Sequence, residues 1–357
     1  MAEETIVAAA RLERFARRIL EGAGVAPEPA RITARALLYA NLRGVDSHGM
    51  QLLPYYIDAL LEKRMRAEGA GRVLSESGGC LLYDGENCLG PVVSEVCCRH
   101  AVRLARAHGL GLVIARRSNH FAAAAAWSRQ ISAAGMIGIV MCNSSPIVPP
   151  WQGREGRVGT NPISVSLPGG EGGRPWLLDM ATTTVALGQI LKAKFKGEPT
   201  IPAGWALDAR GVPTTSTEEA LKGMPMPLGG YKGSGLGLMV EILCAGLSGG
   251  AQGMAVGGIR IKEHPMNTSQ FFLAIDVARF LPLEEFHARM EHLIREVKSA
   301  APAEGYDEVL VAGDPEWRYE EIRGREGIPL APGVWENLLR VAALTGVEAR
   351  IIAPMRY

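Results

Sequence analysis

The sequence lacks the apolar segments that would place a protein in or across a membrane. No stretch approaches the roughly 18 consecutive apolar residues of a spanning helix, and the N-terminal region has no apolar core of the kind found in secretory signals. These absences disfavour both export and membrane insertion. They predict a cytoplasmic protein with no membrane partner.

An excess of charge of one sign is also missing. The chain has 38 basic and 37 acidic side chains, which gives a formal net charge of +1, and it has no basic block. A nucleic-acid partner or an anionic membrane surface therefore has no electrostatic support.

Cysteine is present, but not in the patterns that bind a metal ion or form the disulfide framework of a secreted domain. The six cysteines form no CxxC pair, and none lies at ligand spacing from a histidine. A zinc site is therefore disfavoured. We expect reduced thiols that pack as apolar residues in a cytosolic protein.

The chain does have enough length and apolar periodicity to build a large core. Its 357 residues are 47% hydrophobic, and because domains usually run ~100–200 residues, two lobes are expected. The apolar spacing predicts helices over residues 4–21 and 29–43, then a third helix that begins properly near Pro54 with Asp46 or Ser47 as its cap. Further helices are expected over residues 94–108, 121–134, 182–194, 235–247, 283–298, 316–323 and 332–344.

From about residue 136 the pattern changes to short strand-like runs separated by connectors rich in Gly and Pro. The predicted strands cover residues 112–115, 137–142, 162–167, 176–180 and 271–277. Few helices intervene between the first strands of this region. We therefore expect antiparallel neighbours rather than repeated βαβ units.

Two short segments each place a histidine where a helix is about to start. They are Asp46-Ser47-His48-Gly49 and Ser118-Asn119-His120-Phe121. Histidine is the side chain whose unperturbed pKa lies near neutral pH, and a strand-to-helix corner is a common place to present a catalytic group. His48 and His120 are therefore the first candidates for catalysis.

A third candidate segment is rich in glycine and covers residues 229–237, GGYKGSGLG. It is not a G-x-G-x-x-G loop after a strand, and it is not a P-loop because glycine follows its lysine. Backbone amides at a helix start, beside the single Lys232, suit an anionic group such as a pyrophosphate. A simple glycine hinge is the alternative.

Asp179 ends an apolar strand and is followed by Met180, Ala181 and a cluster of three threonines. Its carboxylate can cap a following helix, hold a ribose or orient an imidazole. The spacing alone does not choose among these roles.

Together these segments resemble the type 2 malate/L-lactate dehydrogenase family of NAD(P)-dependent oxidoreductases. That family includes malate, sulfolactate and ureidoglycolate dehydrogenases, a diketogulonate reductase and reductases of cyclic imines such as piperideine-2-carboxylate. The matching segments occur in one order along almost the whole chain: residues 43–49, 118–121, 143–146, 159–162, 179–182, 204–206 with Asp208, 227–233 and 313–316.

The resemblance implies an α/β (α+β) fold whose coenzyme domain has a largely antiparallel sheet and is not a Rossmann fold. It implies a helical substrate and dimerisation domain formed from both chain ends, residues 1–125 with 282–357, and an NAD(P)-binding domain over residues 126–281. It also implies a homodimer with active sites near the subunit contact.

The resemblance assigns site residues by their position in this sequence. His48 and His120 look like the catalytic pair, with Ser47 beside them. The implied substrate contacts are Tyr56, Leu52, Thr160 and Asn161. The implied contacts to NAD or NADP are Ser144, Asp179, Met180, Ala181, Tyr231, Lys232, Gly313 and Asp314. No metal ligand is implied.

One position departs from the family pattern. Many members have an arginine four residues after the first histidine, suited to bind a substrate carboxylate bidentately, and here that position is Leu52. The carboxylate is therefore bound by another group, or the substrate is less acidic. Arg43, Arg116 and Arg117 are the candidates to compensate.

We therefore expect an enzyme that transfers a hydride between nicotinamide C4 and a 2-oxo or 2-hydroxy acid. His48 would supply the proton and His120 would polarise the substrate, or the two roles are exchanged. The alternative favoured by Leu52 is the reduction of a cyclic imino acid, or of a less acidic carbonyl or imine.

Two other classes of function are disfavoured. A coenzyme-binding protein without catalysis would not need both histidines, and a metal-dependent hydrolase would need metal-ligand spacing that is missing. The choice between NADH and NADPH stays open. Lys192, Lys194 and Lys196 are near enough in sequence to Asp179 to supply a basic pocket for a 2′-phosphate, or they form an exposed helical face.

Overall fold

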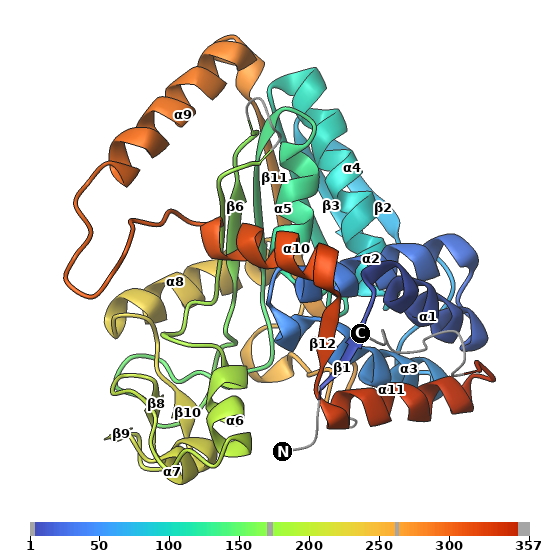
Figure 1. Ribbon diagram of the computed structural model, residues 1–357. Coiled ribbons are helices and arrows are strands. Elements are labelled where there is room, and N and C mark those ends of the chain that lie inside the picture. The colour runs from blue at the N-terminus through green and yellow to red at the C-terminus, as the bar shows by residue number, and fades with distance from the viewer. Residues whose placement is uncertain (1–3, 170–173, 261–263, 349–357) are drawn as a thin grey trace.

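A seven-stranded sheet runs through the middle of the protein (Figure 1). The structure is a computed structural model that describes residues 4–169, 174–260 and 264–348. The strand order is β2-β3-β4-β11-β5-β6-β7; β3 and β4 are parallel, and every other neighbouring pair in the sheet is antiparallel. The strands are β2 (Arg72–Ser77), β3 (Cys80–Asp84), β4 (Leu110–Ser118), β5 (Met136–Cys142), β6 (Ile163–Ser166), β7 (Leu177–Met180) and β11 (Thr268–Asp276). The prediction of a largely antiparallel sheet is confirmed.

Helices cover both faces of this sheet. Helices α4 (Gly90–His108) and α5 (Ala124–Ser132) pack on one face, where β4, β5 and β11 contribute to the main hydrophobic core. The other face is covered by α8 (Tyr231–Glu241) and the short π-helix η3 (Ile242–Gly246). Burial on both faces explains why the central strands are almost continuously apolar.

The two ends of the chain meet in a helical region beside the sheet. It contains α1 (Ala9–Gly22), α2 (Pro27–Leu42), α3 (Leu53–Leu61), α10 (Asp314–Glu326) and α11 (Pro332–Leu344). Strand β1 (Thr5–Val7) pairs antiparallel with β12 (Ile328–Leu330), so blue and red elements lie side by side in Figure 1.

Two further parts lie outside the sheet. A small region combines the sheet of β8 (Ala206–Leu207), β9 (Pro213–Thr214) and β10 (Met224–Pro225) with α6 (Leu187–Phe195) and α7 (Thr217–Lys222). Helix α9 (Leu283–Lys298) extends away from the body (Figure 1), and none of its described residues is buried. The predicted boundary between residues 125 and 126 runs through the seven-stranded sheet, between β4 and β11; the division into domains stays a prediction.

Several predicted helix starts are wrong: α4 begins at Gly90 and α5 at Ala124, not at residues 94 and 121. Two other starts differ for a tertiary reason. The first helix begins at Ala9, because residues 5–7 pair with β12. The helix expected from Thr182 begins at Leu187, because backbone N–H groups of Thr182 and Thr184 bind the carbonyls of Thr160 and Met226. The glycine-rich helix begins earlier than expected, at Tyr231. The helices expected over residues 283–298 and 332–344 are confirmed.

Among the described residues, no helix is both long and apolar enough to cross a bilayer.

Candidate active site

The first histidine lies on two short 3-10 turns between α2 and α3, η1 (Asp46–His48) and η2 (Met50–Leu52). In the structure neither Asp46 nor Ser47 caps a helix through its side chain, so the predicted cap is wrong. The Asp46 carboxylate instead accepts two hydrogen bonds from Arg323 of α10, at 2.7 and 2.9 Å, and one from Asn41 at 2.5 Å. These bonds fix the turn that carries His48.

The second histidine follows the end of β4. Its Nδ1 lies 2.9 Å from the hydroxyl oxygen of Tyr56 and 3.2 Å from the backbone nitrogen of Ala122. Because the N–H of Ala122 can only donate, Nδ1 of His120 accepts, and the proton of the neutral ring is on Nε2. The Tyr56 hydroxyl also lies 2.7 Å from the carbonyl oxygen of His120.

Three buried residues contact the backbone around His120. Its N–H lies 3.0 Å from the sulfur of Met266, and Gln270 donates to the carbonyl of Asn119 at 3.0 Å. Gly90 at the start of α4 packs directly on this corner, where a Cβ atom would overlap the carbonyl oxygens of Asn119 and His120. Only glycine allows this approach, so α4 positions His120.

The two predicted histidines lie together. Their ring centroids are 5.6 Å apart, with an interplanar angle of 28°. The hydroxyl oxygen of Ser47 lies 3.0 Å from Nδ1 of His48. Each imidazole therefore has a hydroxyl at Nδ1, Ser47 for one ring and Tyr56 for the other.

Both rings are uncharged at neutral pH. Burial lowers the pKa of His48, and the positive charge of Arg260 lowers it further. Burial, the neighbouring His48 and Arg260 lower the pKa of His120 to about 3. The pair thus consists of two neutral imidazoles, and the proton position is fixed for His120.

The predicted substrate contacts are mostly internal. Tyr56 has no exposed surface and Leu52 is 3% exposed, so both belong to the main core. Asn161 is fully buried; its Oδ1 accepts from the Ser144 N–H at 3.0 Å, and its Nδ2 donates to Glu241 at 2.9 Å. Their contact with a substrate stays a prediction, because in this structure they pack, hold loops or contact His120.

The predicted coenzyme residues form a second cluster. The hydroxyls of Ser144 and Thr160 lie 3.3 Å apart, and the carbonyl of Thr160 accepts both the N–H and the hydroxyl of Thr182. Thr182 in turn accepts the N–H of Leu228, which leads into the turn before Lys232. The structure thereby brings together residues 144, 160, 179–182 and 228–233.

Of the remaining predicted coenzyme residues, Tyr231 and Lys232 are exposed, Asp314 is partly exposed and Gly313 is buried. Tyr231 is 62% exposed and its ring contacts that of Trp151 edge-on, 6.5 Å away. Lys232 is exposed in the first turn of α8. Gly313, with a φ of 97°, lies against Leu177 of β7, and Asp314 binds Lys298 at 2.7 Å.

Asp179 caps a helix, but not the one that follows it in sequence. Its Oδ2 accepts a hydrogen bond of 2.9 Å from the N–H of Ala125 in the first turn of α5. Part of Asp179 stays open to solvent, yet the surrounding protein desolvates the carboxylate and raises its pKa to about 7.

This raised pKa predicts a pH-dependent stability. Between about pH 4 and pH 7 the unfolded chain releases a proton that the folded chain keeps, so Asp179 contributes stability at low pH that is lost as the pH rises through 7. The difference in melting temperature between Asp179→Asn and the parent protein should therefore increase in favour of the variant as the pH rises from about 4 to about 7. Above pH 7 this difference should stay constant. Calorimetry at a series of pH values measures it.

Asp208 provides the control with the opposite sign. Hydrogen bonds led by the N–H of Val212 lower the pKa of its carboxyl, so Asp208→Asn should lose melting temperature relative to the parent as the pH rises from acid to neutral. A melting-temperature difference between Asp179→Asn and the parent that does not change with pH would contradict the raised pKa of Asp179.

The arginines expected to replace the missing charge at position 52 are engaged elsewhere. Arg117 binds Asp84 at 2.8 Å, and Arg116 lies 3.6 Å from the same carboxylate. Arg43 is buried, pairs with Glu320 at 3.0 Å and packs on the ring of Trp317. Sequence reasoning missed Arg260, whose charge acts on both histidines, because a lone arginine in a loop carries no signal.

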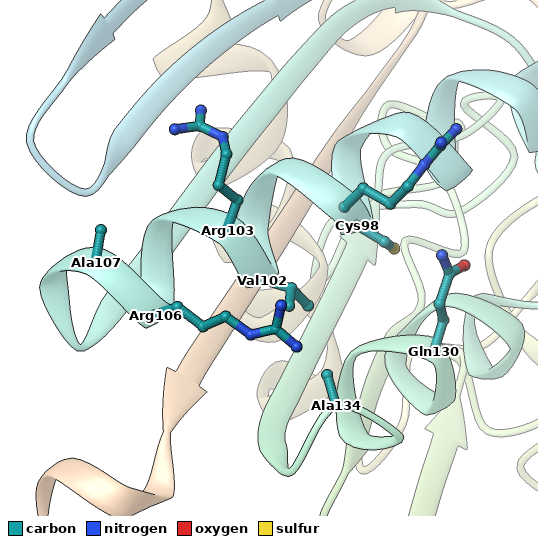
Figure 2. Close-up of a pocket in the computed structure, with 8 residues that line it drawn as sticks. Cys98, Val102, Arg103, Arg106, Ala107, Gln130 and Ala134 are labelled. Atoms are coloured by element: carbon teal, nitrogen blue, oxygen red, sulfur yellow. The ribbon is translucent and has the colours of Figure 1, made fainter.

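A groove of about 700 Å³ lies elsewhere, between α4 and the end of α5 (Figure 2). It is lined by arginines of α4, among them Arg103, which binds Glu76 in β2. None of the predicted site residues lines this groove. The paired histidines, whose ring centroids lie 5.6 Å apart, are the candidate active site.

Two neutral imidazoles close together are the kind of group that enzymes use for acid–base chemistry. The profile of the malate/L-lactate dehydrogenase family matches residues 7–339, and the chain belongs to this family. It is accordingly an oxidoreductase.

Similar proteins cover almost the whole chain. The malate dehydrogenase of Pyrococcus horikoshii is 39% identical over 95% of both chains. The ureidoglycolate dehydrogenase (NAD(+)) of Escherichia coli K12 is 33% identical over 89% of this chain and 90% of that protein. The (2R)-3-sulfolactate dehydrogenase (NADP(+)) of Chromohalobacter salexigens is 36% identical over 75% of this chain and 80% of that protein.

Solved structures agree with this membership. The P. horikoshii malate dehydrogenase structure has a TM-score of 0.89, with 37% identity and coverage of 97% of both chains. The delta1-piperideine-2-carboxylate reductase from Pseudomonas syringae pathovar tomato has a TM-score of 0.81 at 28% identity, over 94% of this chain and 99% of that one.

Proposed function

We propose that the protein is an NAD- or NADP-dependent dehydrogenase that interconverts a 2-oxo acid and a 2-hydroxy acid. The observation that carries the proposal is the pair of neutral, stacked imidazoles, each with a hydroxyl at Nδ1. The similar proteins named as malate, sulfolactate and ureidoglycolate dehydrogenases, which use NAD(+) or NADP(+) where their names state it, support the reaction class.

The residues around the second cluster fit a dinucleotide. The start of α8 has no side-chain cap among the described residues, and Lys232 is exposed in its first turn. Free backbone N–H groups and one cation at a helix N-terminus suit a pyrophosphate. Helix α6 follows this cluster in sequence and approaches Ser47: a Cβ atom added at Gly188 would lie 3.3 Å from the Ser47 side chain.

The two histidines take different roles in the proposed reaction. When bound, the coenzyme accepts or supplies a hydride at nicotinamide C4. His120, neutral and protonated at Nε2, donates a hydrogen bond to the substrate oxygen and polarises its bond to carbon. His48 transfers the proton to or from that oxygen, with Ser47 orienting its ring. A substrate carboxylate nearby raises the pKa of His48 towards neutral pH and so favours the proton transfer.

The test is to assay the purified protein with two parallel series of substrates. Oxidation of NADH and of NADPH is followed by absorbance with open-chain 2-oxo acids in one series and cyclic imino acids in the other. Turnover of the oxo acids supports the proposal. Turnover confined to the imines would replace it with the second candidate below.

The second candidate is reduction of a cyclic imino acid. It is favoured by Leu52, which leaves no charge where the family resemblance expects an arginine, and by the likeness to the piperideine-2-carboxylate reductase structure. An imine carbon accepts a hydride in the same geometry as a carbonyl carbon, so the histidine pair serves either substrate.

We also propose that the protein is a homodimer. The outward face of α8 and η3 exposes Leu238, Met239, Ile242 and Leu247, with exposed fractions between 39% and 57%. A contiguous apolar patch of this kind marks an interaction surface, and a second copy of the chain is the occupant implied by the family resemblance. Light scattering should give twice the mass of the chain, and Ile242→Glu should shift the protein towards monomer; a monomeric parent would contradict the proposal.

A further inference from the structure

None of the positions from which the sequence predicted a carboxylate-binding cation supplies one at the histidine pair. Leu52 is buried in the core, and Arg43, Arg116 and Arg117 are held by acidic residues or an indole ring away from this role. The proposed substrates are acids, and an unpaired carboxylate in a partly desolvated site is costly. A different cation must lie near the histidines if the proposed function holds.

Arg260 enters from the loop between η4 (Gly253–Ala255) and β11. The start of this loop is fixed, because the buried Gly257 accepts a hydrogen bond from the Ser145 hydroxyl at 3.0 Å and its N–H donates to the carbonyl of Met266 at 3.0 Å. The guanidinium lies over the ring of Tyr55, with Cζ 5.2 Å from the ring centroid. Stacking on an aromatic ring restrains an arginine without using its N–H groups.

The loop that carries Arg260 is anchored beside the second histidine. The sulfur of Met266 lies 3.0 Å from the backbone nitrogen of His120, and the carbonyl of Met266 accepts the N–H of Gly257 at 3.0 Å, so both ends of the loop lie next to His120. The charge of Arg260 lowers the pKa of both His48 and His120, so it acts on both rings. Arg260 is itself exposed, as a group that meets a ligand must be.

We infer that Arg260 binds the substrate carboxylate and so replaces the arginine that position 52 lacks. The inference rests on the proposed function and makes its substrate class narrower: the substrate has a carboxylate beside the reacting carbon. The planar guanidinium can form two parallel hydrogen bonds with that carboxylate and so fixes the orientation of the reacting carbon.

The experiment compares an acid with its uncharged analogue. Arg260→Gln and Arg260→Lys are assayed with an accepted 2-oxo acid and with its methyl ester. We expect Arg260→Gln to raise KM for the acid by about 30-fold or more, to change kcat far less and to leave KM for the ester unchanged. Arg260→Lys should give an intermediate KM, because it keeps the charge but loses the bidentate geometry.

The matched control is Arg210→Gln, which removes an arginine that is 80% exposed and paired with Asp208 on the small sheet. It should leave both substrates unaffected. A KM for the acid that does not change in Arg260→Gln, or one that changes equally for acid and ester, would overturn the inference.

A second measurement needs no turnover. NMR titration of the histidine ring protons should show the pKa of His48 and of His120 rising in Arg260→Gln, because a nearby positive charge has been removed. Unchanged titration would show that Arg260 does not act on the rings and would overturn its assignment. A parent protein that turns over no 2-oxo acid, with titration shifted as expected, would instead overturn the proposed function.

Discussion

Replacing His48 with asparagine is expected to lower kcat by about 10²–10⁴-fold, the usual contribution of a positioned general acid or base. Asparagine keeps a polar group of similar size next to Ser47, but it cannot exchange a proton near neutral pH. Binding of NADH or NADPH, followed by fluorescence titration, should change little, because the predicted coenzyme cluster around Ser144 and Thr160 does not include His48.

The same assay on other variants separates a catalytic role from a general loss of histidine. His292→Asn removes an imidazole on α9 that is 75% exposed, and this variant should keep the parent activity. His120→Asn should also lose activity, because the Nε2–H donor is removed. Full activity in both His48→Asn and His120→Asn would refute the mechanism, and loss confined to His120→Asn would assign the proton transfer to His120.

Arg323→Met is expected to destabilise the protein by about 2–3 kcal/mol and to lower kcat/KM by about 10–100-fold. Arg323 is 9% exposed and holds both oxygens of Asp46. Its removal leaves that carboxylate with Asn41 as its described partner and frees the turn that carries His48. Because Asp46 is 45% exposed, the expected loss lies below that of a fully buried pair. Thermal unfolding and steady-state kinetics measure the two effects.

A matched arginine tests whether the effect depends on location. Arg340 binds both oxygens of Asp58 at 3.1 and 3.0 Å, but its side chain is 44% exposed. Arg340→Met should cost less than about 1 kcal/mol, as exposed ion pairs usually do, and should leave kcat/KM unchanged. Equal effects of the two substitutions on kcat/KM would contradict a specific role for Arg323 in holding His48.

The sequence predicted those parts of the fold that local signals determine. The helices over residues 283–298 and 332–344 carry apolar periodicity and a proline at their start, and their bounds are correct. The short strand of residues 5–7 was missed because it exists only through pairing with residues 328–330, far away in the sequence. Threonines 182–184 were predicted as a helix start for the same reason: their non-helical form depends on hydrogen bonds to distant carbonyl groups.

The site shows the same division between local and distant information. The polar settings of His48 and His120 marked them in the sequence, and the structure stacks the two rings. The groups that hold them in place have no local signature: Arg323 is one arginine in a charged helix, and Gly90 one glycine among 43. Asn161 matched a family motif, but its interaction with Glu241 in α8 became visible only with tertiary structure.

The bond between Asp46 and Arg323 also has a consequence for how the protein is made. The two residues are 277 positions apart. The segment with His48 therefore leaves the ribosome early, and Arg323, which binds Asp46 in that segment, leaves it late. Contacts between such distant segments form slowly, because a long loop must close first. The nascent chain therefore cannot complete the Asp46–Arg323 bond that fixes the turn with His48 during most of synthesis, and this bond forms only after α10 has emerged and docked.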